Sequence, residues 1–104
     1  MSTLMLSATA ASTGSAFQIR STSDLYANRS FQAVGVMSSS TGTATVIIEV
    51  SNDGVNYVTL GTITLALTTS PSSDLFFAYT VYEFYRARVS QVTSNGTVTV
   101  YMKA

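Results

Sequence analysis

The sequence contains no cysteine, no histidine and no tryptophan. Without cysteine the chain has no disulfide framework, no thiolate nucleophile and no zinc knuckle. Without histidine the usual general base is missing as well, so catalysis would depend on five carboxylates. Two of these, Asp53 and Asp74, stand in a turn and beside a loop, where Asp makes local hydrogen bonds. We therefore predict no enzymatic activity, no catalytic residue, no cofactor and no metal site.

Charge and long apolar runs are scarce too. Charged residues make up 10% of the 104 positions, and five Lys and Arg balance five Asp and Glu, so the net charge is zero. Such a chain lacks the basic stripe typical of nucleic-acid binding. No apolar run approaches the roughly 20 residues that cross a bilayer. We expect neither nucleic acid nor membrane as a partner, and we interpret residues 1–11 as a first strand, because they lack the basic start of a signal peptide.

What the sequence does contain is alternation with a period of two. Over residues 43–51, small and branched apolar side chains occupy every second position, as a half-buried strand requires. Turn signals follow at 52–54 and 94–96, each ending in glycine. Strands are expected at 3–8, 16–20, 31–38, 43–51, 57–60, 62–68, 76–81, 84–92 and 97–102, with a bulge or bend at Gly61. The prediction is one all-β domain over residues 1–104, an antiparallel β-sandwich or small jelly-roll-like barrel of about eight or nine short strands.

The same alternation predicts the core. The expected inward side chains are Phe31, Ala44, Val46, Ile48, Val50, Val58, Leu60, Ile63, Leu65, Tyr85, Ala87, Val89, Val98 and Val100. Gly35 is expected to mark a bulge or a close backbone approach within its strand. Residues 21–30 are expected to form a polar loop with room for one helical turn at 23–24.

A dense group of aromatic residues predicts an interaction surface. Six of the eleven aromatics fall within residues 76–85, and consecutive rings cannot both face one core in a regular strand. Exposed aromatics are enriched at protein interfaces. The candidate interface residues are Leu4, Leu6, Phe76, Phe77, Tyr79, Tyr82, Arg86 and Arg88, with residues 1–20 as a strand or arm that makes assembly contacts.

Two of these candidates, Arg86 and Arg88, have two interpretations. They lie two positions apart on one strand and so share a face. They could form a paired contact for a partner's carboxylates, or cross-strand ion pairs with Glu49 or Glu83. We prefer the ion pairs.

Five segments carry a family resemblance. They are FQAVG at 31–35, VSNDGVNY at 50–57, LGTITL at 60–65, YRARV at 85–89 and VTVYM at 98–102. Together they resemble a family of small virion structural proteins of tailed bacteriophages. The resemblance implies a decoration or cement role on the capsid, with the major capsid protein as partner, or a neck or fibre component. It brings no catalytic residue.

The resulting hypothesis is a non-enzymatic phage structural protein that self-associates as a dimer or trimer and stabilises the capsid at the virion surface. The alternative is a glycan-binding module on the virion that stacks host sugars on Tyr57, Tyr79 or Tyr82. A third hypothesis is a structural joint in the neck or tail.

Overall fold

The structure is a computed structural model that describes residues 2–19 and 27–103. Within these ranges every regular element is a strand and none is a helix. The strands are β1 (Ser2–Ala8), β2 (Ser12–Thr13), β3 (Phe17–Gln18), β4 (Ala27–Met37), β5 (Gly42–Ser51), β6 (Val58–Leu67), β7 (Ser72–Thr80), β8 (Phe84–Val92) and β9 (Gly96–Lys103). The all-β prediction is therefore confirmed.

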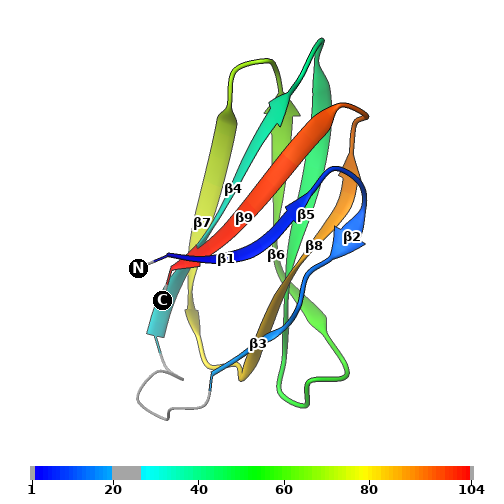
Figure 1. The fold of residues 1–104 in the computed structure, drawn as a ribbon. Helices are drawn as coiled ribbons and strands as arrows, with labels where there is room; N and C mark the ends of the chain where they lie inside the picture. Colours follow the sequence, from blue (N-terminus) through cyan, green and yellow to red (C-terminus); the bar gives the residue numbers. More distant parts are fainter. Residues whose placement is uncertain (1, 20–26, 104) are drawn as a thin grey trace.

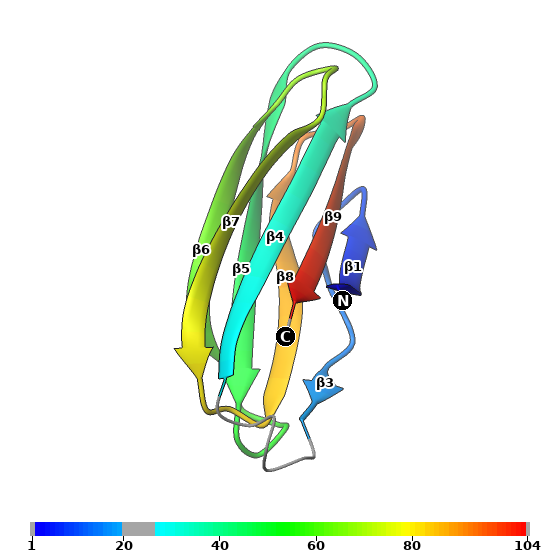
Figure 2. The same ribbon diagram turned by 90° about the vertical axis from the view of Figure 1, so that its left-hand side faces the viewer.

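The strands form two antiparallel sheets that face each other as a sandwich (Figure 1). One sheet has the order β1-β9-β4-β7, and the other has the order β2-β8-β5-β6, with β3 also paired to β8. Figure 2 shows the two layers from the side, with β6 and β7 next to each other along one border of the sandwich. The first and last strands, β1 and β9, are hydrogen-bonded neighbours.

The alternating residues form the core between the sheets, as predicted, with two exceptions. Twelve predicted core residues are buried, among them Phe31, Val46 and Tyr85. Leu60 is only half-buried, and Val58 is wrong as a core residue because 64% of it is exposed. Val58 is the first residue of β6 and lies opposite Val50, so it stands at the end of an edge strand, directly after the loop at 52–57.

The bulge expected near Gly61 is present in β6. Ile48 pairs with Gly61 and Glu49 pairs with Thr59, so Leu60 is an extra residue without a partner on β5. A bulge reverses which side chains face the core on its two sides. The predicted strands at 57–60 and 62–68 are thus one strand with an interruption, and the glycine allows the Phe76 ring to lie against the backbone.

Two strands begin earlier than the sequence predicts. β4 starts at Ala27 and β7 starts at Ser72, four residues before the expected starts in each case. Each extension pairs with the other end of the partner strand: residues 27–30 lie opposite residues 77–80, and residues 72–75 lie opposite residues 32–35. The predicted loop is therefore wrong for residues 27–30, and the helical turn expected at 23–24 lies outside the described residues.

Candidate interaction surface

The outward face of the four-stranded sheet carries a group of apolar side chains. On β7 the alternation sends Phe76 inward, where its ring centroid lies 5.3 Å from that of Phe31. It sends Leu75, Phe77 and Tyr79 outward, and they are 56%, 73% and 64% exposed. Because β7 is an edge strand, these three side chains also lie at the border of the sheet.

The sheet order brings the first strand into the same surface. Leu4 on β1 lies opposite Tyr101 on β9, Tyr101 lies opposite Gln32 on β4, and Gln32 lies opposite Leu75. Residues paired in this way point to the same side of a sheet. Leu4, 54% exposed, therefore ends a row that crosses all four strands. We call Leu4, Leu75, Phe77, Tyr79 and Tyr101 the outer apolar face.

The neighbours of the outer apolar face are mostly uncharged polar residues. Phe77 lies opposite Ser30, which lies opposite Lys103, and Tyr79 lies opposite Asn28. Lys103 is the one charged side chain in these rows among the described residues. Monomeric proteins rarely expose large contiguous apolar patches, and those they do expose often mark interaction sites.

Three of the candidate interface residues do not lie on the outer apolar face. Leu6, Phe76 and Tyr82 are half-buried and pack against the core. The Tyr82 ring meets Tyr85 edge-on, with 6.5 Å between centroids. The candidates that remain open to a partner on this sheet are Leu4, Phe77 and Tyr79. Leu75 and Tyr101 were missed, although Leu75 continues the alternation of Phe77 and Tyr79 and could have been found from it.

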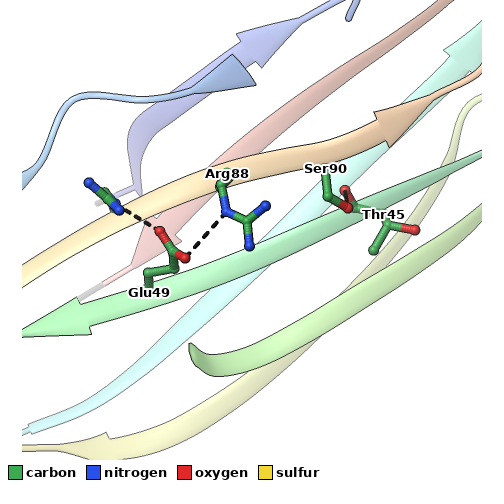
Figure 3. A network of polar contacts seen from close by, with 5 residues as sticks. Thr45, Glu49, Arg88 and Ser90 are labelled. Atoms are coloured by element: carbon green, nitrogen blue, oxygen red, sulfur yellow. Dashed lines mark hydrogen bonds and ion pairs between the residues drawn. The ribbon is translucent and has the colours of Figure 1, made fainter. Parts of the chain in front are cut away.

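Arg86 and Arg88 lie on the outward face of the other sheet and bind Glu49. Arg86 Nε donates to Glu49 Oε1 over 2.8 Å, and Arg88 Nε donates to Oε2 over 3.3 Å (Figure 3). The Arg86 guanidinium also lies 3.8 Å from the ring centroid of Tyr57. The cross-strand ion pairs with Glu49 are therefore confirmed, while Glu83 instead accepts a hydrogen bond from Gln18.

This arrangement changes the acidity of Glu49. Burial raises the pKa of Glu49, but the hydrogen bonds from Arg86 and Arg88 outweigh burial and hold the pKa below its ordinary value. A carboxylate with a lowered pKa in the folded state contributes stability above its unfolded pKa, and that contribution is lost as the pH falls through the folded pKa.

We expect the free energy of unfolding of the wild-type protein to fall as the pH is lowered below about 4.5. The Glu49→Gln variant lacks this titrating group, so its free energy of unfolding should not show the part of the decrease that is due to Glu49. The curves of stability against pH for the wild type and for Glu49→Gln should therefore converge at acid pH. Urea denaturation from pH 7 to pH 2.5 measures both curves. A constant separation between them over this range would contradict the ion-pair assignment.

The loop between β5 and β6 is closed by its own hydrogen bonds. Asp53 Oδ1 accepts the N–H groups of Val55 and Asn56 over 2.8 Å each, and Asp53 Oδ2 accepts the Asn56 amide. The backbone N–H groups of Asn56 and Val55 hold the pKa of Asp53 well below its ordinary value. Gly54 has φ +75°, so the predicted turn is present, although the loop is longer than a two- or three-residue hairpin. Both carboxylate oxygens of Asp53 therefore accept hydrogen bonds from within the loop.

The described residues offer surfaces rather than a cavity. No pocket is found in residues 2–19 and 27–103, nor a group of three or more acidic, histidine or cysteine side chains that could hold a metal ion. Over the same residues, no helix has the length and apolar character needed to cross a bilayer.

The sequence matches no protein-family model and no curated protein. The fold is similar to solved structures. The PBSX exported protein XepA has a TM-score of 0.57 at 12% identity, over 100% of this chain and 37% of XepA. The SPBc2 prophage-derived protein YomS has a TM-score of 0.57 at 13% identity, over 98% of this chain and 90% of YomS.

A third similar structure is the N-terminal cellulose-binding domain of a Cellulomonas fimi β-1,4-glucanase, with a TM-score of 0.51 at 12% identity, over 76% of this chain and 60% of that domain. At these identities the similarities establish the shared β-sandwich fold. This chain spans little more than a third of the length of XepA.

Proposed function

We propose that this chain is a non-enzymatic structural protein of a phage particle, which decorates the capsid and stabilises it by binding the major capsid protein. The observation that carries the proposal is the outer apolar face, where Leu75, Phe77 and Tyr79 are each more than half exposed. The prophage origin of XepA and YomS, which share the fold, supports a phage setting.

The physical basis of attachment would be apolar burial against the particle. Aromatic side chains supply most of the binding energy at many protein interfaces. The outer apolar face lies on one side of a single sheet, and its described rows hold only one charge, that of Lys103. A surface of this kind loses little hydration of charged groups when it is covered. It therefore suits a broad protein surface better than a small ligand.

The copy number of the chain in purified virions tests this proposal. Capsid decoration predicts a copy number in the hundreds, whereas a neck or tail joint follows a closed ring of about six or twelve copies. Quantitative mass spectrometry, with the major capsid protein as internal standard, measures the ratio. A ring-sized count would favour the joint, and absence of the chain from purified virions would overturn both structural roles.

A glycan-binding module is the second candidate function. The exposed ring of Tyr79 next to Phe77 on a sheet surface favours it, because sugars stack on exposed aromatic rings. The other two tyrosines named for this role are less available, since Tyr57 lies beneath Arg86 and Tyr82 packs on the core. A glycan array probed with wild-type protein and with Tyr79→Ser separates the two functions. Hits that Tyr79→Ser removes would favour sugar binding over capsid attachment.

A further inference from the structure

The two sheets have four edges, and three of them are poor templates for another strand. β1 carries an extra residue, Met5, between the paired positions Leu4 and Leu6. β6 carries its bulge at Leu60. The remaining edge consists of β2 and β3, which have two residues each. Bulges and very short strands are the usual means by which proteins prevent pairing with other chains.

The fourth edge, β7, has none of these protections. It pairs with β4 through nine consecutive residues, from Ser72 to Thr80, without a register shift. Within these residues there is no proline, no glycine and no lysine, and Asp74 is the one charge. No strand in the described part of the chain pairs with the other edge of β7. A long, regular and apolar edge strand is a template for strand addition.

We propose that a second copy of this chain pairs with β7 in antiparallel orientation and joins the two four-stranded sheets into one of eight strands. A two-fold axis perpendicular to the sheet relates the copies, so both outer apolar faces lie on the same side. Two residues that lie opposite each other across this axis must have their side chains on the same face of the joined sheet, either both outward or both inward. The pairing is therefore centred on a residue, with Phe76 or Phe77 nearest the middle of β7.

The sequence of β7 fits its own reversed copy in both registers. Centred on Phe77, the strand places Leu75 opposite Tyr79 of the second copy and Phe77 opposite Phe77. Centred on Phe76, it places Leu75 opposite Phe77 of the second copy. Asp74 faces Thr80 in the first register and Ala78 in the second, so no like charges meet. Apolar and aromatic cross-strand pairs stabilise an antiparallel pairing relative to alanine pairs.

A second copy suits this edge for two further reasons. The chain has zero net charge, so two copies do not repel each other at long range. Pairing through the main chain also leaves the outward side chains on one continuous surface, which doubles the outer apolar face available to a particle. The inference adds a partner to the proposed function but does not depend on it, because self-association is measured without particles.

A pair of matched leucine variants tests the inference. Leu75 and Leu4 belong to the same row on the same face and are 56% and 54% exposed, but they lie on opposite edges of the sheet. We expect Leu75→Lys to raise the dimer dissociation constant by roughly tenfold or more, because two copies of the lost contact occur in each dimer. Leu4→Lys should leave this constant unchanged. Sedimentation equilibrium of wild-type protein and both variants measures the values.

Cysteine cross-linking gives an independent readout, since the chain has no cysteine of its own. Directly opposed residues of antiparallel strands have Cα atoms about 4.5–5.5 Å apart, within reach of a disulfide. Phe77→Cys should cross-link to itself in the register centred on Phe77, and to tagged Leu75→Cys in the register centred on Phe76. Leu4→Cys is the control and should show only background cross-linking.

Two results would overturn the proposal. One is a wild-type protein that stays monomeric up to high micromolar concentration. The other is equal weakening by Leu75→Lys and Leu4→Lys, together with β7 cross-linking no greater than that of Leu4→Cys. Neither result bears on particle binding, so failure of the dimer and failure of capsid attachment remain separate outcomes.

Discussion

Replacing Arg29 by alanine is expected to lower the free energy of unfolding by about 3 kcal/mol, a large share of the roughly 5–15 kcal/mol that stabilises a domain. Arg29 is 1% exposed and lies on the inward face of β4, two residues before Phe31. Its Nη1 donates to Thr80 Oγ1 over 2.7 Å, and its guanidinium carbon lies 5.2 Å from the Tyr85 ring centroid.

The expected loss has three sources. Removal of the long side chain leaves a cavity beside two residues, Thr80 and Tyr85, that are completely buried. The buried Thr80 hydroxyl loses its hydrogen bond from Arg29. The stacking of the guanidinium on the Tyr85 ring is lost as well. Urea denaturation followed by circular dichroism at pH 7 measures the change.

Arg88→Ala provides the matched control for Arg29→Ala. The Arg88 side chain is 37% exposed, and Glu49 is its ion-pair partner. Exposed ion pairs usually contribute less than about 1 kcal/mol, so the control should retain most of the stability. Equal losses in the two variants would contradict the assignment of Arg29 to the core.

The double substitution Phe77→Ser and Tyr79→Ser is expected to abolish attachment to particles. These residues are the most exposed rings of the outer apolar face. A central aromatic residue at an interface often contributes about 2 kcal/mol or more, so losing two should weaken binding by roughly 1,000-fold. The melting temperature should change little, because exposed side chains away from special features contribute little to folding. Co-sedimentation with particles that lack the chain measures the binding.

The matched control for this double variant is Val55→Ser with Val58→Ser. Val55 and Val58 are 78% and 64% exposed, so replacing them also removes exposed apolar surface. Val55 lies in the loop before β6 and Val58 is the first residue of β6, so both are on the other sheet. This control should bind particles as the wild type does. Equal loss of binding in both double variants would show that general surface stickiness, rather than the outer apolar face, causes attachment.

Much of the fold follows from local patterns in the sequence. The alternation through Val46 and Ile48 defined β5 and its buried face, and Asn95, with φ +73°, forms the predicted turn between β8 and β9. The glycine at 61 marked the bulge in β6. These features depend on neighbours within a few residues, and composition and period are sufficient to locate them.

The features that were missed depend on pairing between distant segments. The starts of β4 and β7 are rich in polar residues and become strands because each pairs with a more apolar part of the other strand: residues 27–30 lie opposite 77–80, and residues 72–75 lie opposite 32–35. Arg29 faces the core because β4 starts early enough to include it. A charged residue in a segment read as a polar loop gives no local signal of such burial.

The candidate surface was predicted in part for the same reason. The aromatic cluster indicated an interface, but only the register of β7 shows that Phe77 points outward while Phe76 packs on Phe31. Leu4 and Leu75 are 71 positions apart in the numbering and share one row because β9 and β4 lie between them. Sheet order of this kind cannot be read from the spacing of residues.

The most direct test of the account is a titration of purified wild-type protein against particles that lack the chain. We predict saturable co-sedimentation, a rise in the melting temperature of the particles at saturation, and loss of both effects in the Phe77→Ser, Tyr79→Ser protein. Wild-type protein that stays in the supernatant at every concentration, with no change in particle melting, would contradict the proposal that this sheet surface attaches to a phage particle.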